Sequence, residues 1–106
     1  MDMSELIVRS GVPALSSQHA SKGAIAYVRL VSPGSSWECY ISEASMTTDG
    51  LVIYGYFIAD TRFWYQMTLT KLVRLLAESG LSIVVDDAFT PLSVSDALNI
   101  RRPHAA

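Results

Sequence analysis

The chain has 106 residues, half of them hydrophobic and 17% charged, and a formal net charge of −2. This composition is too apolar for a disordered chain. The length predicts one domain, residues 1–106, that buries a core without disulfides or metal. The acidic balance argues against binding to double-stranded DNA, which clustered Lys and Arg side chains drive.

The location of the protein is predicted from what the sequence lacks. A single cysteine, Cys39, cannot form an internal disulfide, which is typical of a reducing cytoplasm. No signal peptide opens the sequence, and no apolar run approaches the roughly 20 residues that cross a bilayer. We therefore expect a cytoplasmic protein without contact to a membrane.

The first half of the chain predicts two strands after a weakly patterned start. Residues 5–8 fit either a short strand or a helical turn, and residues 1–20 are expected to be flexible. Ala24–Val31 is typical of a strand, and residues 32–36 form a turn cluster. Trp37–Glu43 alternates between an apolar and a polar row, which predicts a strand with one wet face. The apolar row is Trp37, Cys39 and Ile41, and the wet row is Glu38, Tyr40 and Ser42.

Leu51–Ile58 and Arg62–Leu69 predict a hairpin around a short polar break. Pairing across the break places Gly55 opposite Tyr65, and we expect Tyr65 to cover the gap that the glycine leaves. One row of the hairpin is almost wholly apolar and is expected to face the core. It consists of Leu51, Ile53, Gly55, Phe57, Phe63, Tyr65, Met67 and Leu69.

Residues 68–79 predict the main helix, because apolar residues recur there at helical spacing. Either Thr68 or Thr70 can cap its start, and Gly80 suits the left-handed residue that ends it. Its buried side would consist of Leu69, Leu72, Val73 and Leu76.

The end of the chain predicts a fifth short strand, residues 81–85, and a short helix, Asp96–Arg101, capped by Ser93 or Ser95. The tail 103–106 is expected to be flexible. The sum is an α+β fold: an antiparallel meander of four to five strands, one main helix on one face and a short C-terminal helix.

Candidates for chemistry are few. His19 and His104 have no Cys, Asp or Glu at metal-ligand spacing. Asp86 and Asp87 could bind a cation, although two solvated acids at a strand end are commoner. Cys39 belongs to an apolar row and is expected to be buried and inert. We therefore expect no enzyme, no cofactor and no metal site.

The second row of the hairpin is aromatic but mixed with polar groups, which is typical of a partly exposed binding surface. In the alternative interpretation, residues 1–20 or a second subunit cover this row. Stacking on nucleic acid is a third possibility, weakened because only Arg29 and Arg62 lie near enough to contact phosphates. The predicted partner-binding residues are Tyr54, Tyr56, Arg62 and Trp64, with Tyr40 on the neighbouring strand.

The order of these segments resembles a bacterial family catalogued only as domain of unknown function number 2958. The likeness covers roughly residues 13–95 and is firmest between Pro33 and Glu43. The sequence departs from the family pattern at Cys39, Gln66 and Lys71, where a tryptophan, a tyrosine and an acid are usual. The matching residues are Pro13, Leu15, Val28, Leu30, Pro33, Ser35, Trp37, Tyr40, Glu43, Gly55, Leu69, Leu72, Gly80, Leu81, Asp86, Phe89, Pro91 and Leu92.

The resemblance implies a context rather than a reaction, because the family has no known catalytic residues. Its members are short proteins carried by plasmids, phages and other mobile elements. By analogy with small acidic proteins of that origin, we expect a non-enzymatic interaction module that inhibits a host defence system of the CRISPR or restriction type. The alternatives are a homodimeric accessory protein and a small nucleic-acid-binding module.

Overall fold

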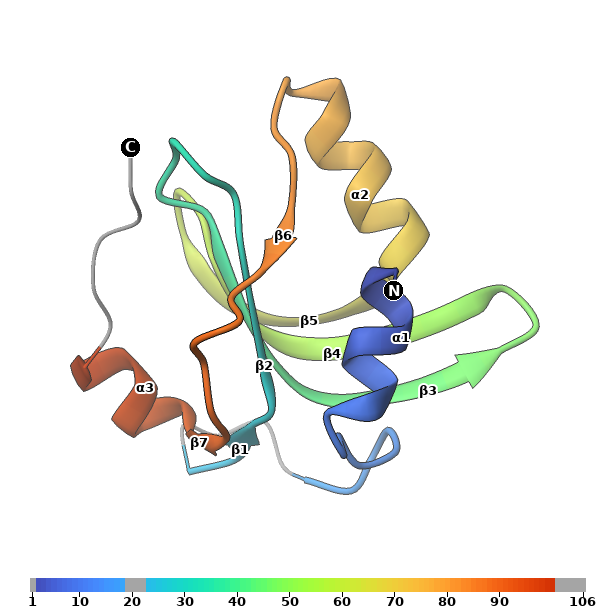
Figure 1. The fold of residues 1–106 in the computed structure, drawn as a ribbon, viewed down its shortest axis with the longest axis vertical. Helices are drawn as coiled ribbons and strands as arrows, with labels where there is room; N and C mark the ends of the chain where they lie inside the picture. Colours follow the sequence, from blue (N-terminus) through green and yellow to red (C-terminus); the bar gives the residue numbers. More distant parts are fainter. Residues whose placement is uncertain (1, 19–22, 101–106) are drawn as a thin grey trace.

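Five antiparallel strands form the main sheet of an α+β fold, in the order β5-β4-β3-β2-β6 (Figure 1). The computed structural model describes residues 2–18 and 23–100. Its main strands are β2 (Val28–Val31), β3 (Glu38–Thr47), β4 (Gly50–Ile58), β5 (Arg62–Thr68) and β6 (Val84–Val85). The predicted α+β meander, with its fifth strand after the main helix, is confirmed.

The remaining elements cover this sheet. The helices are α1 (Met3–Arg9), α2 (Leu69–Glu78) and α3 (Val94–Ile100), and β1 (Ile25–Ala26) pairs with β7 (Leu92–Ser93) in a separate small sheet. In Figure 1, α2 and α3 lie on opposite sides of the main sheet. Within residues 2–18 and 23–100, no helix is long and apolar enough to span a membrane.

Each face of the sheet has its own core. The first core joins the sheet to α1 and α2 through Ile7, Ile53 and Leu72, among others. The second joins it to α3 through Tyr40, Tyr56 and Val94, among others. The prediction of a wet face on β3 is therefore wrong, because the C-terminal segment covers it. Of the predicted wet row, Glu38, Tyr40 and Ser42 are all at most 2% exposed, whereas the predicted buried row Trp37, Cys39 and Ile41 is confirmed.

The β4–β5 hairpin has the predicted register. Tyr56 pairs with Trp64 and Gly55 with Tyr65. The predicted gap at Gly55 is absent, since a Cβ there would lie 2.3 Å from the carbonyl oxygen of Tyr40 on β3. Glycine is required at this position because two backbones approach closely, not because a neighbour fills a hole.

That close approach accompanies a β-bulge in β3, where the register with β4 shifts between Ile41 and Glu43. An extra residue in a strand exchanges its two faces from that point on. Ala44 accordingly joins the first core with Cys39 and Ile41, although its number has the opposite parity. Glu43 is thereby turned to the other face, opposite Tyr54 of β4.

Helix α2 starts and ends as its sequence predicts. The Thr68 hydroxyl accepts a hydrogen bond from the Lys71 amide at 3.2 Å, and Gly80 has φ +78° just beyond the helix. The amides of Gly80 and Leu81 close the helix end by donating to Ala77 and Leu76. Of the predicted buried side of α2, Leu69, Leu72 and Leu76 are buried. The prediction that Val73 is buried is wrong: its side chain is 42% exposed because it lines a surface groove beside α1.

One predicted strand is interrupted, and of the two alternatives for residues 5–8 the structure has the helical one. The predicted strand Ala24–Val31 breaks at Tyr27, so Ala26 packs in the second core and Val28 in the first. Residues 5–8 lie within helix α1. Ser93 is the cap of α3, since its hydroxyl accepts from the Asp96 amide at 3.1 Å. His19, His104 and the tail 103–106 lie outside the described residues.

Candidate functional site

The predicted aromatic surface is mostly interior. Tyr40 is fully buried and Tyr56 is 6% exposed, both in the second core, so the prediction that they lie on a partly exposed face is wrong. Trp64 packs against Tyr56, with ring centroids 5.4 Å apart, and stacks on Tyr54 at 5.5 Å and 22°. Tyr54 and Trp64 are half-buried and Arg62 is exposed. Three of the five predicted residues thus remain at the surface.

The opposite side of β5, predicted to be core, is exposed instead. Phe63 is 40% and Tyr65 is 48% exposed, although Phe63 stacks on Phe57 with ring centroids 5.6 Å apart. Helix α2 begins directly after Thr68, and Met67, next to the helix, is partly buried against the first core, which Phe63 contacts through Phe57. The remainder of the row lies beyond the cover that α2 provides. Strand β5 therefore presents aromatic side chains on both of its faces.

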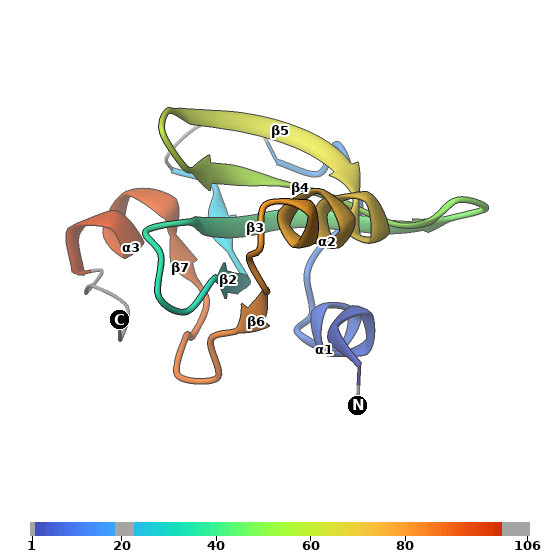
Figure 2. The ribbon, with the colours of Figure 1, turned by 90° about the horizontal axis from the view of Figure 1, so that it is seen from above.

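Strand β5 is also an edge of the sheet. Figure 2 shows it as the outermost strand, with β4 on one side. Among the described residues, no strand pairs with its other side. The opposite edge, β6, has only two residues, whereas β5 has seven. Unpaired backbone groups on a long edge are a template for another strand, and natural edges are blunted by charged side chains, especially Lys, by Pro, by bulges or by covering elements. The segment Arg62–Thr68 contains neither Lys nor Pro, and its one charged side chain is Arg62 at its start.

Two buried carboxylates lie on β3, and sequence patterning assigned neither a role. The first, Glu38, accepts hydrogen bonds from Arg29 at 3.1 and 2.8 Å and from the Tyr40 hydroxyl at 2.7 Å. Arg29 also donates to Asp86 at 2.7 Å. Asp86 is thus an ion-pair partner, while Asp87 is exposed.

Burial and this network shift the pKa values of their members. Burial lowers the pKa of the Arg29 guanidinium, but hydrogen bonds to Asp86 and Glu38 outweigh it and raise the pKa above its ordinary value. Burial, with the hydrogen bond to Glu38, raises the pKa of Tyr40 to about 12. The cluster therefore holds a permanently charged arginine against carboxylates, and it closes the β2 side of the second core.

The second carboxylate, Glu43, is 2% exposed and is held by backbone amides. One oxygen accepts from the Ser16 amide at 2.8 Å and the other from the Gln18 amide. Ser16 has φ +70°, which is uncommon for a residue with a side chain and turns the loop towards the carboxylate. The Gln18 side chain fixes this loop by bonding to both backbone groups of Ile25 and to the Ser42 carbonyl.

A polar cavity of about 220 Å³ opens beside Glu43. Its wall is one cross-strand row, in which Glu43 pairs with Tyr54 and Tyr54 pairs with Gln66. Burial, followed by the charge of Glu43, raises the pKa of Tyr54. The remaining lining residues are Ser16 and Gln18. The bulge in β3 creates this site, and no periodicity in the sequence indicates it; the one signal was an acid inside a strand between Ser42 and Ala44.

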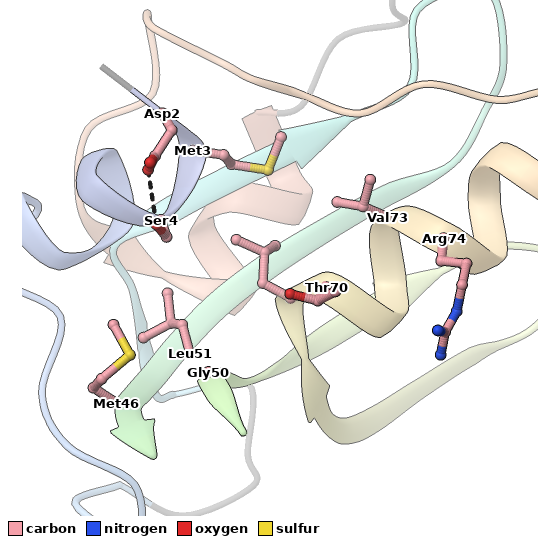
Figure 3. A pocket seen from close by; sticks show the side chains of 10 residues that line it. Asp2, Met3, Ser4, Met46, Gly50, Leu51, Thr70, Val73 and Arg74 are labelled. Carbon is pink, nitrogen blue, oxygen red and sulfur yellow. Dashed lines mark hydrogen bonds between the residues drawn. The ribbon is translucent and has the colours of Figure 1, made fainter. Parts of the chain in front are cut away.

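A larger groove, of about 600 Å³, lies between α1, the β3–β4 turn and the start of α2 (Figure 3). Figure 3 shows Met3, Met46 and Val73 around it, with Arg74 at one end. Met46 is 66% exposed. The groove is mostly apolar, and its polar lining consists of Asp2, Ser4, Thr70 and Arg74. The Asp2 carboxylate caps α1 by accepting from the Glu5 amide at 2.9 Å and the Ser4 hydroxyl at 2.7 Å.

Other candidates for chemistry are inert. Cys39 is buried, and burial raises the pKa of its thiol well above the ordinary value, which disfavours a thiolate. Within residues 2–18 and 23–100, no three His, Cys, Asp or Glu side chains converge in a way that could hold a metal ion. The structure therefore offers an exposed aromatic edge and a polar cavity as sites of function.

No family model, no curated protein and no solved structure matches this chain. The resemblance to domain of unknown function number 2958 accordingly stays a prediction.

Proposed function

We propose that this chain is a protein-interaction module that binds an extended segment of another protein along the free edge of β5. The observation that carries this proposal is a seven-residue edge strand with aromatic side chains exposed on its surface. In this mode of binding, main-chain hydrogen bonds to the edge supply affinity and side-chain contacts supply specificity.

The side chains of β5 suit such contacts. Tyr and Trp dominate the energetic centres of protein interfaces, and Arg is enriched there too. Trp64 lies on one face of the strand and Tyr65 on the other, and Arg62 is exposed at its start. A strand added to this edge would therefore contact an aromatic side chain of β5 on each face of the extended sheet. Arg62 is the one charged side chain of β5 that it would meet.

A second candidate function, homodimerisation through the same edge, is favoured by charge placement. Two copies of β5 paired antiparallel about Tyr65 would place Arg62 opposite Thr68 and Trp64 opposite Gln66. No like charges then face each other, and like charges directly opposite one another would destabilise the pair. This arrangement would join the two five-stranded sheets into one continuous sheet.

The experiment replaces Tyr65 with a photo-crosslinking phenylalanine analogue and identifies what it captures in the source cell. Leu75, which is 43% exposed on α2, is the matched control position. We expect one partner to cross-link at position 65 and not at position 75. With purified components, Tyr65→Ser should then weaken binding more than tenfold and Leu75→Ser should not.

The outcomes are distinct. Capture of a second copy of this chain, with a dimer in sedimentation equilibrium that Tyr65→Ser dissociates, supports the second candidate. Equal capture at both positions, or unchanged affinity in Tyr65→Ser, contradicts both.

Two further parts of the proposal have narrower support. A non-enzymatic role fits the buried Cys39 and the occupied Glu38 network, and a cytoplasmic location fits the single thiol. Inhibition of a host defence system is supported only by the resemblance of the sequence to a mobile-element family. Double-stranded DNA is not the expected partner because the net charge is −2.

A further inference from the structure

The described lining of the cavity beside Glu43 holds no counter-charge for this buried carboxylate. Glu43 is as buried as Glu38, which is paired with Arg29. Among the described residues, no Lys, Arg or His side chain forms an ion pair with Glu43. Two backbone amides offset only part of the cost of removing a carboxylate from water. A cation in the cavity would offset more of it.

The cavity has unused acceptor positions, beside the donors that Tyr54 and Gln66 also carry. A carboxylate has about four lone-pair positions, and the Ser16 and Gln18 amides use one on each oxygen of Glu43. Within the described part of the chain, the side chains of Tyr54 and Gln66 have no hydrogen-bond partner. Each carries an oxygen that can accept, so several acceptors line one small space.

The shape of the site favours a planar cation. The Tyr54 ring borders the cavity and is itself stacked on Trp64, which fixes its orientation. Guanidinium stacks on aromatic faces and donates two parallel hydrogen bonds to a carboxylate, whereas ammonium is a compact and more strongly hydrated charge. One free position on each oxygen of Glu43 matches the two parallel donors.

We propose that the cavity lined by Glu43, Tyr54 and Gln66 is a binding site for a guanidinium group. Its volume of about 220 Å³ accommodates the end of an arginine side chain rather than a large ligand. Since Gln66 lies on β5, an arginine of a protein docked on that edge is one source of the group, and this part rests on the proposed function. A free small guanidinium compound is the other source.

The test titrates the whole protein with three probes and follows the side-chain amide of Gln66 and the ring of Tyr54 by NMR. The probes are ethylguanidinium, ethylammonium and the blocked peptide acetyl-Gly-Arg-Gly-amide. We expect ethylguanidinium to bind at least tenfold more tightly than ethylammonium. Equal affinity for ethylguanidinium and the peptide indicates a free compound as the natural ligand, and tighter binding of the peptide indicates an arginine side chain.

Two variants separate the cation site from the fold. Glu43→Gln removes the charge and should weaken ethylguanidinium binding at least tenfold, but it also disturbs the bonds to the loop. Gln66→Arg supplies a guanidinium from the exposed strand without removing a buried bond, and it should block the probe. Thr61→Arg adds the same charge on the exposed β4–β5 turn, outside the cavity lining, and is the control that should keep binding within about threefold.

The proposal is overturned if ethylguanidinium shifts neither Tyr54 nor Gln66, or if Gln66→Arg and Thr61→Arg bind it equally well. Neither result bears on the edge of β5, because Tyr65 lies on the other face and is tested by cross-linking. Conversely, if no partner cross-links at position 65 but ethylguanidinium still binds the cavity, the proposed function is contradicted and the guanidinium site is not.

Discussion

Strand β3 carries two glutamates of equal burial and different surroundings. Glu38 and Glu43 are both 2% exposed, and their side chains lie on the same face of the sheet. Glu38 bonds to Arg29 and Tyr40, and a second carboxylate, Asp86, shares the arginine. Glu43 bonds to two backbone amides and borders a cavity. Burial alone therefore does not indicate a site, whereas a cavity whose described lining holds no counter-charge for the carboxylate does.

Removing the arginine tests the surroundings of Glu38. Arg29→Met leaves Glu38 and Asp86 without their shared cation in a largely buried position, and we expect it to cost about 3–5 kcal/mol of unfolding free energy. Urea unfolding measures this, with Arg29→Lys as the charge-retaining control, which should recover part of the loss. A cost below about 1 kcal/mol would show that the network does not stabilise the fold.

Alkaline pH weakens the same network through Tyr40. The pKa of Tyr40 is about 12 in the folded protein against an ordinary 10.0, so the unfolded chain releases the proton first as pH rises. Stability from this group is present below pH 10 and is lost between pH 10 and 12, by about 2 kcal/mol. Unfolding curves of the parent and Tyr40→Phe over this range check it. If the unfolding free energy of the parent and of Tyr40→Phe falls equally steeply with pH, the buried, Glu38-bonded environment assigned to Tyr40 is contradicted.

Gly55 connects the two glutamates, because it permits the bulge that places Glu43 on the face of Glu38. Gly55→Ala forces a Cβ to within 2.3 Å of the Tyr40 carbonyl oxygen. We expect a cost of about 1–3 kcal/mol from this overpacking. Hydrogen exchange should show the Ser16 and Gln18 amides losing protection while the interior of α2 keeps its own. Gly80→Ala is the control for glycine replacement without a clash: its φ of +78° should also cost stability, but the protection of the Ser16 and Gln18 amides should not change. Unchanged protection at Ser16 and Gln18 would argue against a link between bulge and cavity.

The sequence predicted elements more reliably than surfaces. The hairpin register, the main helix with its Thr68 cap and the burial of Cys39 all follow from local spacing, which short-range patterns record. The predicted burial was wrong for part of each hairpin row, because burial depends on which elements cover each face. The C-terminal segment buries Tyr40 and Tyr56, and α2 leaves Phe63 and Tyr65 exposed. The packing of a helix from a distant part of the chain against a strand cannot be read from the residue pattern of that strand.

The candidate site was hidden for a different reason. Alternation along Trp37–Glu43 assumes an unbroken strand, and the bulge after Ile41 reverses it just before Glu43. The loop that holds Glu43 lies about 25 residues earlier and has no strong pattern of its own. An acid between Ser42 and Ala44 inside a strand was the available signal, and only the pairing register shows where it points.

The most direct test of the difference between the two glutamates also has the smallest predicted energy. Gln66→Arg gives Glu43 the guanidinium that Glu38 already has. A double-mutant cycle with Glu43→Gln, measured by urea unfolding, isolates the pairwise term, and Thr61→Arg on the neighbouring turn is the control for added charge. We predict a favourable coupling of about 0.5–1 kcal/mol between the introduced guanidinium and Glu43, and none for the control. A coupling of zero, or one equal to the control, would contradict an open cation site at Glu43.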